Sequence, residues 1–167
     1  MRGKAGGQRD PAMHQVKKGN QWYFGMKAHV GVDSKQGIVH SAEATAANTA
    51  DAKVLLELLH GNEHKVWGDA AYQGQGEKIR WKPPQAQDMT SRRARYKHVA
   101  DELQRQKNRT RARVRSKAEH VFRAMKRQFG FGRARYRGLA NNANRIFACF
   151  ALVNLYIPRK RLAPLGA

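Results

Sequence analysis

The sequence has few of the features that mark membrane, secreted or disulfide-bonded proteins. Its single cysteine, Cys149, cannot form a disulfide within the chain and suits a reducing compartment. No apolar run approaches the length that crosses a bilayer, and residues 1–10 lack the apolar centre of a signal peptide. We therefore expect a cytoplasmic protein without membrane contact, and its 167 residues suffice for one ordinary domain.

Acidic residues are also scarce, and their distribution is uneven. The chain has 33 Lys and Arg but only 12 Asp and Glu, which gives a net charge of +21. Residues 1–72 carry nine basic and seven acidic side chains (+2), whereas residues 73–167 carry 24 and five (+19). Such a field attracts a polyanion because binding releases condensed counterions. The charge favours a nucleic-acid partner over two alternatives, a basic structural protein such as a ribosomal one and a protein that binds acidic membranes.

The spacing of apolar residues predicts a mixed α/β chain. Alternating apolar residues predict strands, and apolar residues three and four apart predict helices. The predicted elements are a loop over 1–20, an antiparallel hairpin of strands 22–32 and 38–45, a short helix around 54–59, strands over 65–68 and 79–81, a partly helical segment over 91–107, and helices over 111–128 and 141–157. Strands and helices in this order are typical of a mixed α/β fold.

Two carboxylates occupy positions that suit chemistry. Asp69 follows a predicted strand, and ligand sites in α/β sheets lie beyond the carboxyl ends of strands. Glu119 is the only acidic residue from position 103 to the end of the chain, and it falls on a predicted helix. Each also has an ordinary structural explanation: Asp69 would cap a turn, and Glu119 would pair with Arg115 or Arg123 on one helix face. Neither residue alone decides between the two.

The histidines and tryptophans have simpler explanations than ligand binding. His60 and His64 are four residues apart, but the predicted helix ends near Gly61 and no partner pair is present, which argues against zinc. For His29, on the predicted strand 22–32, packing in the sheet or exposure to solvent explains the residue better than catalysis. The tryptophans are expected in the core or the sheet rather than on a base-stacking surface; they are Trp22, Trp67 and Trp81.

Four stretches of the sequence form a recognisable combination. They are Gly68-Asp69-Ala70-Ala71-Tyr72-Gln73-Gly74; Arg115, Glu119, His120, Phe122 and Lys126; Met13 to Lys27; and Arg137-Gly138-Leu139-Ala140-Asn141. The combination resembles bacterial insertion-sequence DDE transposases of the family-four and family-five type, and the likeness runs from about Asp10 to about Tyr156. The resemblance implies a ribonuclease-H-like α/β fold, a mixed sheet with flanking helices. It also implies DNA transposition through metal-dependent DNA strand cleavage and strand transfer.

The resemblance implies a site of three carboxylates that hold two Mg²⁺ or Mn²⁺ ions. Asp69 would be the second carboxylate and Glu119 the third, whereas Ala112 stands where the family has a tyrosine. Hard cations prefer carboxylate oxygens, and basic side chains suit a phosphate on which charge develops. A supporting role for His120 stays open. Arg115 and Lys126 match the basic residues that accompany the glutamate in the family. The side chains expected to contact DNA are Arg111, Arg113, Arg115, Arg123, Lys126, Arg135 and Arg137.

The family's first aspartate has no counterpart in this sequence. It lies on a strand upstream of the stretch that matches Met13, and Asp10 and Asp33 are not credible substitutes because they fall in a predicted loop and turn. We therefore expect the chain to be a C-terminal portion of a transposase, inactive and poorly ordered on its own. An upstream fragment of the same transposase should restore both its order and its activity. The expected parts are a loop remnant over 1–20, a catalytic domain without its first, central strand over 21–157, and a C-terminal tail over 158–167.

Two functions are compatible with these observations. The first is a DDE transposase, or a fragment of one, that acts on insertion-sequence ends and target DNA. Such an enzyme would work at the bacterial nucleoid and would be a homo-oligomer when intact. The second is a catalytically inactive, basic nucleic-acid-binding relic. The resemblance favours the first function, and the missing aspartate favours the second.

Overall fold

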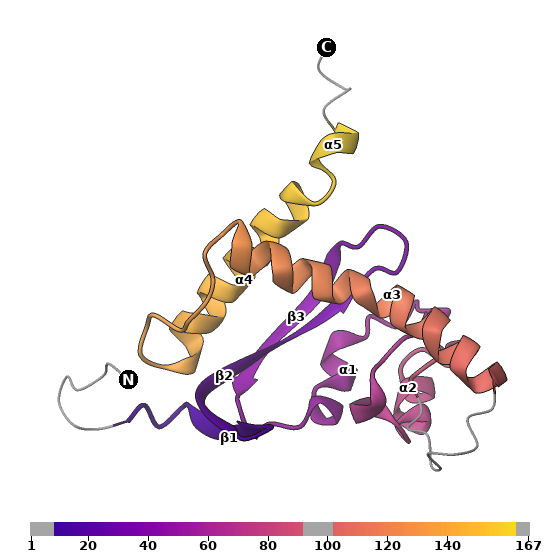
Figure 1. Cartoon of the computed structure of the whole chain (residues 1–167), viewed down its shortest axis with the longest axis horizontal. Coiled ribbons are helices and arrows are strands. Elements are labelled where there is room, and N and C mark those ends of the chain that lie inside the picture. The colour runs from indigo at the N-terminus through magenta and orange to yellow at the C-terminus, as the bar shows by residue number, and fades with distance from the viewer. Residues whose placement is uncertain (1–8, 92–101, 163–167) are drawn as a thin grey trace.

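The computed structural model describes residues 9–91 and 102–162, which form a mixed α/β fold (Figure 1). The strands are β1 (His14–Lys18), β2 (Gln21–Val32), β3 (Val39–Ala46), β4 (Lys65–Val66) and β5 (Gln87–Asp88). The helices, with η marking 3₁₀ turns, are η1 (Asp51–Lys53), α1 (Leu55–Leu58), η2 (Ala70–Tyr72), α2 (Gly76–Trp81), α3 (Glu102–Arg127), α4 (Leu139–Tyr156) and α5 (Arg159–Leu162). None of these helices combines the length and apolar character needed to cross a bilayer. The predicted α/β class is confirmed.

The first sheet is built on the long strand β2. Residues 21–25 of β2 pair antiparallel with β1, and the rest of the strand, from Met26, pairs antiparallel with β3. Because the strand order is β1-β2-β3, the two partners lie on opposite edges of β2. The predicted hairpin is confirmed, and β3 is displaced by one residue, to 39–46.

The prediction of a loop over residues 1–20 is wrong for residues 14–18, which form β1. A two-residue turn of Gly19 and Asn20 joins β1 to β2, and Gly19 takes the φ of 60° that such a hairpin turn requires. The strand consists mostly of polar residues and is held by backbone pairing, so apolar alternation did not reveal it. The expected tail over 158–167 likewise contains a short helix, α5.

β4 and β5 form a separate parallel pair, and within the described ranges no strand joins this pair to the first sheet. Backbone hydrogen bonds extend the pairing beyond the two-residue strands: the N–H groups of Met89 and Ser91 donate to the carbonyls of Val66 and Gly68, each at 2.9 Å. The predicted strand over 65–68 is therefore shorter as a regular strand, but its pairing reaches the residue before Asp69.

The larger core lies between the β2–β3 hairpin and the helices α3 and α4 (Figure 1). Val121 of α3 and Val153 of α4 are fully buried, and Met26 and Val30 pack against them from β2. Burial of one such valine stabilises the fold by about 1.5–3 kcal/mol. The predicted helices 111–128 and 141–157 are confirmed, although α3 begins earlier, at Glu102. The part of the predicted helical segment that covers 92–101 lies outside the described residues.

A second, smaller core supports the region around Asp69. Ile79 of α2 is fully buried in it, and Tyr72 packs against its edge. The prediction of a strand over 79–81 is wrong, because these residues end the helix α2. A short apolar run in a sequence is compatible with a strand or with a helix. Here the residues form a helix that buries Ile79 in the smaller core. The buried members of this core are Leu55, Leu59, Val66, Ile79 and Ala86.

A polar cluster joins β2 to the segment that follows β3. The side chain of His29 is only 2% exposed, and its ring nitrogens lie 2.9 Å from Thr45 Oγ1 and 3.2 Å from Asp51 Oδ1. Lys27 Nζ lies 3.3 Å from the same Asp51 oxygen and donates to the Thr49 carbonyl at 2.9 Å. Burial lowers the pKa of His29 below its ordinary 6.5, against the opposing effect of the Asp51 charge. His29 is therefore packed, not exposed to solvent, and is neutral near pH 7.

The buried, neutral His29 predicts a loss of stability in mild acid. Because the pKa of His29 is lower in the folded chain than in the unfolded chain, the unfolded chain takes up a proton first as the pH falls. We expect the thermal midpoint to fall as the pH drops from about 7 to about 5, the range in which histidines titrate. The His29→Gln variant should lose part of this pH dependence, as measured by circular dichroism melts. His14→Gln, on the exposed face of β1, is the control, and identical pH profiles for His29→Gln and the parent would contradict the prediction.

Candidate metal-binding and nucleic-acid site

Asp69 lies where the β4–β5 pair ends and η2 begins. Its Oδ1 accepts a hydrogen bond from the Ala71 N–H at 2.8 Å and so caps η2. Its other carboxylate oxygen, Oδ2, has no hydrogen bond or salt bridge to the described residues. The turn-capping role expected from the sequence is therefore present, and it leaves one oxygen of a half-buried carboxylate uncommitted.

The chain next to Asp69 is packed so tightly that position 68 has no room for a side chain. A Cβ at Gly68 would lie 2.9 Å from Thr90 Cγ2 and 3.1 Å from Tyr72 Cδ2, so a larger residue would displace both. Burial, together with the charges of Asp51 and Asp69, raises the pKa of Tyr72 to about 12. Tyr72 thus stays protonated and covers Gly68 while η2 turns the chain away from the strand.

Arg111 connects α3 to the region of Asp69. Its Nη1 donates to the Thr90 carbonyl at 2.8 Å, and the Thr90 side chain packs beside Gly68. The Nε of Arg111 is buried and has no hydrogen-bond partner in the part of the chain that the structure describes. Arg111 was predicted to contact DNA; the structure instead commits one end of its guanidinium to the backbone and leaves the group only partly exposed.

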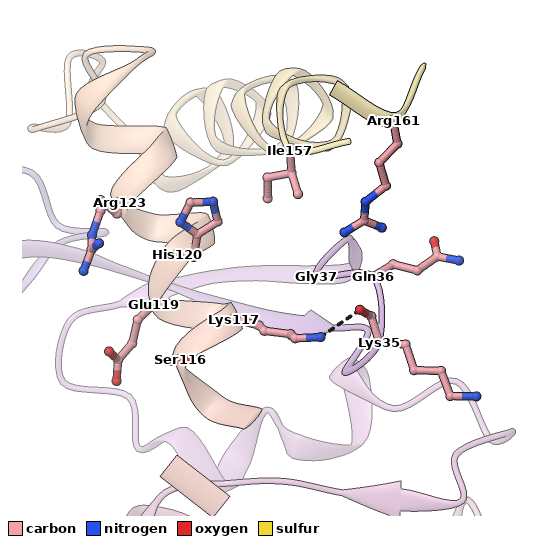
Figure 2. Close-up of a pocket in the computed structure, with 10 residues that line it drawn as sticks. All are labelled: Lys35, Gln36, Gly37, Ser116, Lys117, Glu119, His120, Arg123, Ile157 and Arg161. Carbon is pink, nitrogen blue, oxygen red and sulfur yellow. Dashed lines mark hydrogen bonds between the residues drawn. The ribbon is translucent and has the colours of Figure 1, made fainter. Parts of the chain in front are cut away.

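Glu119 lies on the exposed side of α3. Within residues 9–91 and 102–162 it makes no salt bridge, so the pair with Arg115 or Arg123 that the sequence allowed is not formed. It lines a pocket of about 490 Å³ between the turn at 33–37, α3 and the chain around α5. Figure 2 shows Lys117 reaching toward that turn, whereas Glu119 and Arg123 point to the other side of α3.

The described residues do not assemble a complete metal site. No group of three or more His, Cys, Asp or Glu side chains among them is placed to hold an ion. Uncommitted carboxylate oxygens at Asp69 and Glu119 are the right donor type for Mg²⁺, but two separate carboxylates are too few for two ions. Asp10 and Asp33 do not fill the gap: Asp10 accepts from the Ala12 and Gly138 N–H groups, and Asp33 accepts from the N–H groups of its own turn.

The side chains predicted to contact DNA lie mainly on α3 and on the loop that follows it. α3 holds ten Lys and Arg against two acidic residues. Of the seven predicted side chains, Arg111 and Arg115 are partly buried. The other five are exposed to solvent: Arg113, Arg123, Lys126, Arg135 and Arg137.

Asn142 holds the arginine loop in place, and the sequence analysis gave it no role. It is fully buried in α4. Its Oδ1 accepts from the N–H groups of Arg135 and Tyr136 (3.1 and 3.2 Å), and its Nδ2 donates to the carbonyls of Tyr136 and Gly138 (2.6 and 2.8 Å). The sequence did contain a signal of this role: Asn142 lies on the same helix face as the apolar residues Ile146 and Val153, and a polar side chain buried on such a face requires hydrogen-bond partners.

A family model described as a transposase DDE domain matches residues 4–155, which is most of the chain. The chain belongs to the transposase DDE domain family. No solved structure matches it.

Membership of the DDE family agrees with the fold and gives the general chemistry. Antiparallel and parallel strands with covering helices are consistent with a ribonuclease-H-like transposase domain, as the resemblance implied. DDE transposases carry out transposition by cleaving DNA and use divalent metal ions. A DNA substrate therefore follows from the family, and the exposed arginines of α3 and the loop are suited to its phosphates.

Replacement of Asn142 by alanine is expected to release the arginine loop. The change removes four part-buried hydrogen bonds, each with a net contribution to stability of about 0.5–1.5 kcal/mol. We expect lower stability and faster amide hydrogen exchange at Arg135 and Tyr136, measured by exchange with NMR or mass spectrometry. Asn144→Ala, at an exposed position of the same helix, is the control. Unchanged exchange at both amides in Asn142→Ala would show that Asn142 does not hold the loop.

Proposed function

We propose that this chain is a C-terminal portion of a bacterial insertion-sequence transposase that cleaves and transfers DNA strands at the ends of its element. The observation that carries the proposal is that both Asp69 and Glu119, the residues that the sequence resemblance assigns to two of the three carboxylates, keep uncommitted oxygens in the fold. The bacterial insertion-sequence type is supported by the motif Gly68–Gly74 and by the spacing of Arg115, Glu119 and Lys126. We further propose that the intact protein acts at the nucleoid as a homo-oligomer.

The arrangement of the strands supports the idea that a central strand comes from elsewhere. From Met26 to Val32, β2 pairs with β3 on one edge only, and β4 pairs with β5 on one edge only. No strand of the described residues occupies the other edge of either. Unpaired edges leave backbone N–H and carbonyl groups without ladder partners. A strand between β2 and β4, the place of the first strand in ribonuclease-H-like folds, would satisfy both edges and bring the first aspartate beside Asp69.

Within this proposal the residues of the chain have distinct roles. Asp69 and Glu119 are metal ligands, and the third carboxylate is supplied with the inserted strand. Mg²⁺ or Mn²⁺, when bound, would activate the attacking water or 3′-hydroxyl and stabilise the leaving oxygen. Arg115 and Lys126, on the same helix as Glu119, would bind the phosphates that flank the cleaved bond. The other exposed arginines of α3 and its loop would hold the DNA backbone in register.

The alternative function, a catalytically inactive DNA-binding relic, is favoured by one specific observation. The described residues contain no group of three side chains placed to bind a metal ion. The two functions separate in one comparison: the chain joined to its upstream segment either cleaves a transposon end in the presence of Mg²⁺ or only binds it.

Neutral replacements of the two carboxylates test the proposed ligands. In the chain joined to the upstream segment, Asp69→Asn or Glu119→Gln removes the charge that a hard cation requires while it preserves size. We expect Mg²⁺-dependent nicking of a labelled transposon end to fall on the order of a hundredfold or more, with DNA affinity nearly unchanged. Glu57→Gln, at an exposed position on α1, is the control. Near-parental nicking by Glu119→Gln would leave Glu119 with a structural role only.

The basic segment predicts binding that depends steeply on salt. Residues 92–137 hold 17 Lys and Arg against three acidic residues. Each contacted phosphate adds roughly 0.9 to the slope of log affinity against log salt concentration. The double change Arg135→Gln and Arg137→Gln should therefore reduce the slope by up to about 1.8, measured by fluorescence anisotropy on random duplexes. Lys53→Gln, an exposed lysine in the first half of the chain, is the control. A slope near zero in the parent would exclude phosphate-driven binding.

A further inference from the structure

Three consecutive aromatic side chains are exposed at the start of β2. Trp22, Tyr23 and Phe24 are 65%, 49% and 44% exposed. The sequence led us to expect the tryptophans in the core or the sheet, and this is wrong for Trp81, which is 75% exposed on α2. Trp22 does belong to the sheet, but its side chain lies in solvent. The reason is that the larger core begins at Met26, where β2 changes partner from β1 to β3, so the hairpin before it projects past the covering helices.

One face of this hairpin combines aromatic rings with cations. Lys17 faces Trp22 across the strands, and its Nζ lies 5.9 Å from the centre of the indole ring. Phe24 lies on the same face two residues on, and the Arg9 guanidinium carbon lies 5.5 Å from the centre of its ring. Tyr23 points to the opposite face and donates its hydroxyl hydrogen to Gln21 Oε1 at 2.6 Å. We name the face formed by Arg9, Lys17, Trp22 and Phe24 the aromatic face.

We propose that the aromatic face binds unpaired bases of DNA by stacking, an inference that rests on the proposed DNA function. Asp10, next to Arg9, accepts hydrogen bonds from the Ala12 and Gly138 N–H groups, and residues 11–32 contain no acidic residue, so the surroundings of the face are net basic and favour an anionic partner. Exposed rings stack with bases, while neighbouring Lys and Arg contact the phosphates between them. A duplex keeps its base faces covered by neighbouring base pairs, so only a single strand or an opened end can present a base to Trp22 and Phe24.

The charge also distinguishes this partner from a second copy of the chain. On an identical hairpin, Lys17 of each copy would meet no acidic partner between residues 11 and 32 of the other copy, because that stretch contains none. A nucleic-acid strand offers both a ring for the aromatic side chains and a phosphate for the cations. The aromatic face therefore complements a single strand better than it complements itself.

The test compares a single-stranded thymidine oligonucleotide with a duplex of equal length, each fluorescently labelled, on the 167-residue chain. Trp22→Ala and Phe24→Ala should each weaken single-strand binding about tenfold, the scale of one base–aromatic stack, and change duplex binding less than about twofold. Trp22→Phe should retain most of the affinity. Trp81→Ala, which removes a tryptophan that is 75% exposed on α2, is the matched control and should change neither affinity.

Each outcome decides between the proposals. Binding of the single strand should quench tryptophan fluorescence in the parent and in Trp81→Ala, but not in Trp22→Ala. Unchanged single-strand affinity in Trp22→Ala, with duplex binding intact, would overturn the stacking surface and leave the proposed function standing. A shift in oligomeric state on sedimentation with unchanged affinity would assign the face to a second copy and would also overturn it. A parent that melts cooperatively by circular dichroism but binds neither DNA would refute the proposed function itself.

Discussion

The packing of α3 across the β2–β3 hairpin is the contact on which the rest of the structure depends. Val121 and Met125 of α3 close the larger core against the sheet, and the opposite side of the same helix carries Glu119 and exposed basic residues. One helix therefore fixes both the fold and the place of the candidate site. Because interiors are close-packed, a change in the size of Val121 would shift the helix and with it the whole charged surface.

The buried residues form two separate clusters, and this shapes the relation between the candidate ligands. Glu119 is fixed by the larger core and Asp69 by the smaller one. Polar contacts join the two parts: Arg111 reaches the Thr90 carbonyl, and Lys27 and His29 hold Asp51. Such contacts contribute less net stability than apolar packing and depend on solvation. Under the proposed function, a strand inserted between β2 and β4 would add backbone pairing to this polar connection.

Periodicity in the sequence was sufficient where one face of an element is buried. It located the β2–β3 hairpin and both long helices, because their apolar stripes meet a single core. It failed at β1, whose largely polar side chains hide a strand held by backbone pairing, and at 79–81, where only tertiary burial of Ile79 selects a helix. Alternation placed Trp22 in the sheet but did not show that its side chain is exposed, because the pattern continues into residues 21–25 of β2, outside the larger core.

The sequence named the candidate ligands Asp69 and Glu119, whose role stays a prediction, but not how they are placed relative to each other. Spacing alone placed Asp69 after a strand and Glu119 on a helix, and the family resemblance supplied their roles. Asp69 lies at the end of the β4–β5 pair and Glu119 on α3, and no local pattern in the chain predicts how these two elements are placed relative to each other. Asn142 shows the opposite case: its position among apolar helix residues signalled a buried polar group that requires partners. Polar residues on apolar faces therefore reveal how a basic loop is held, whereas a metal site shared between segments becomes visible only when every segment is in place.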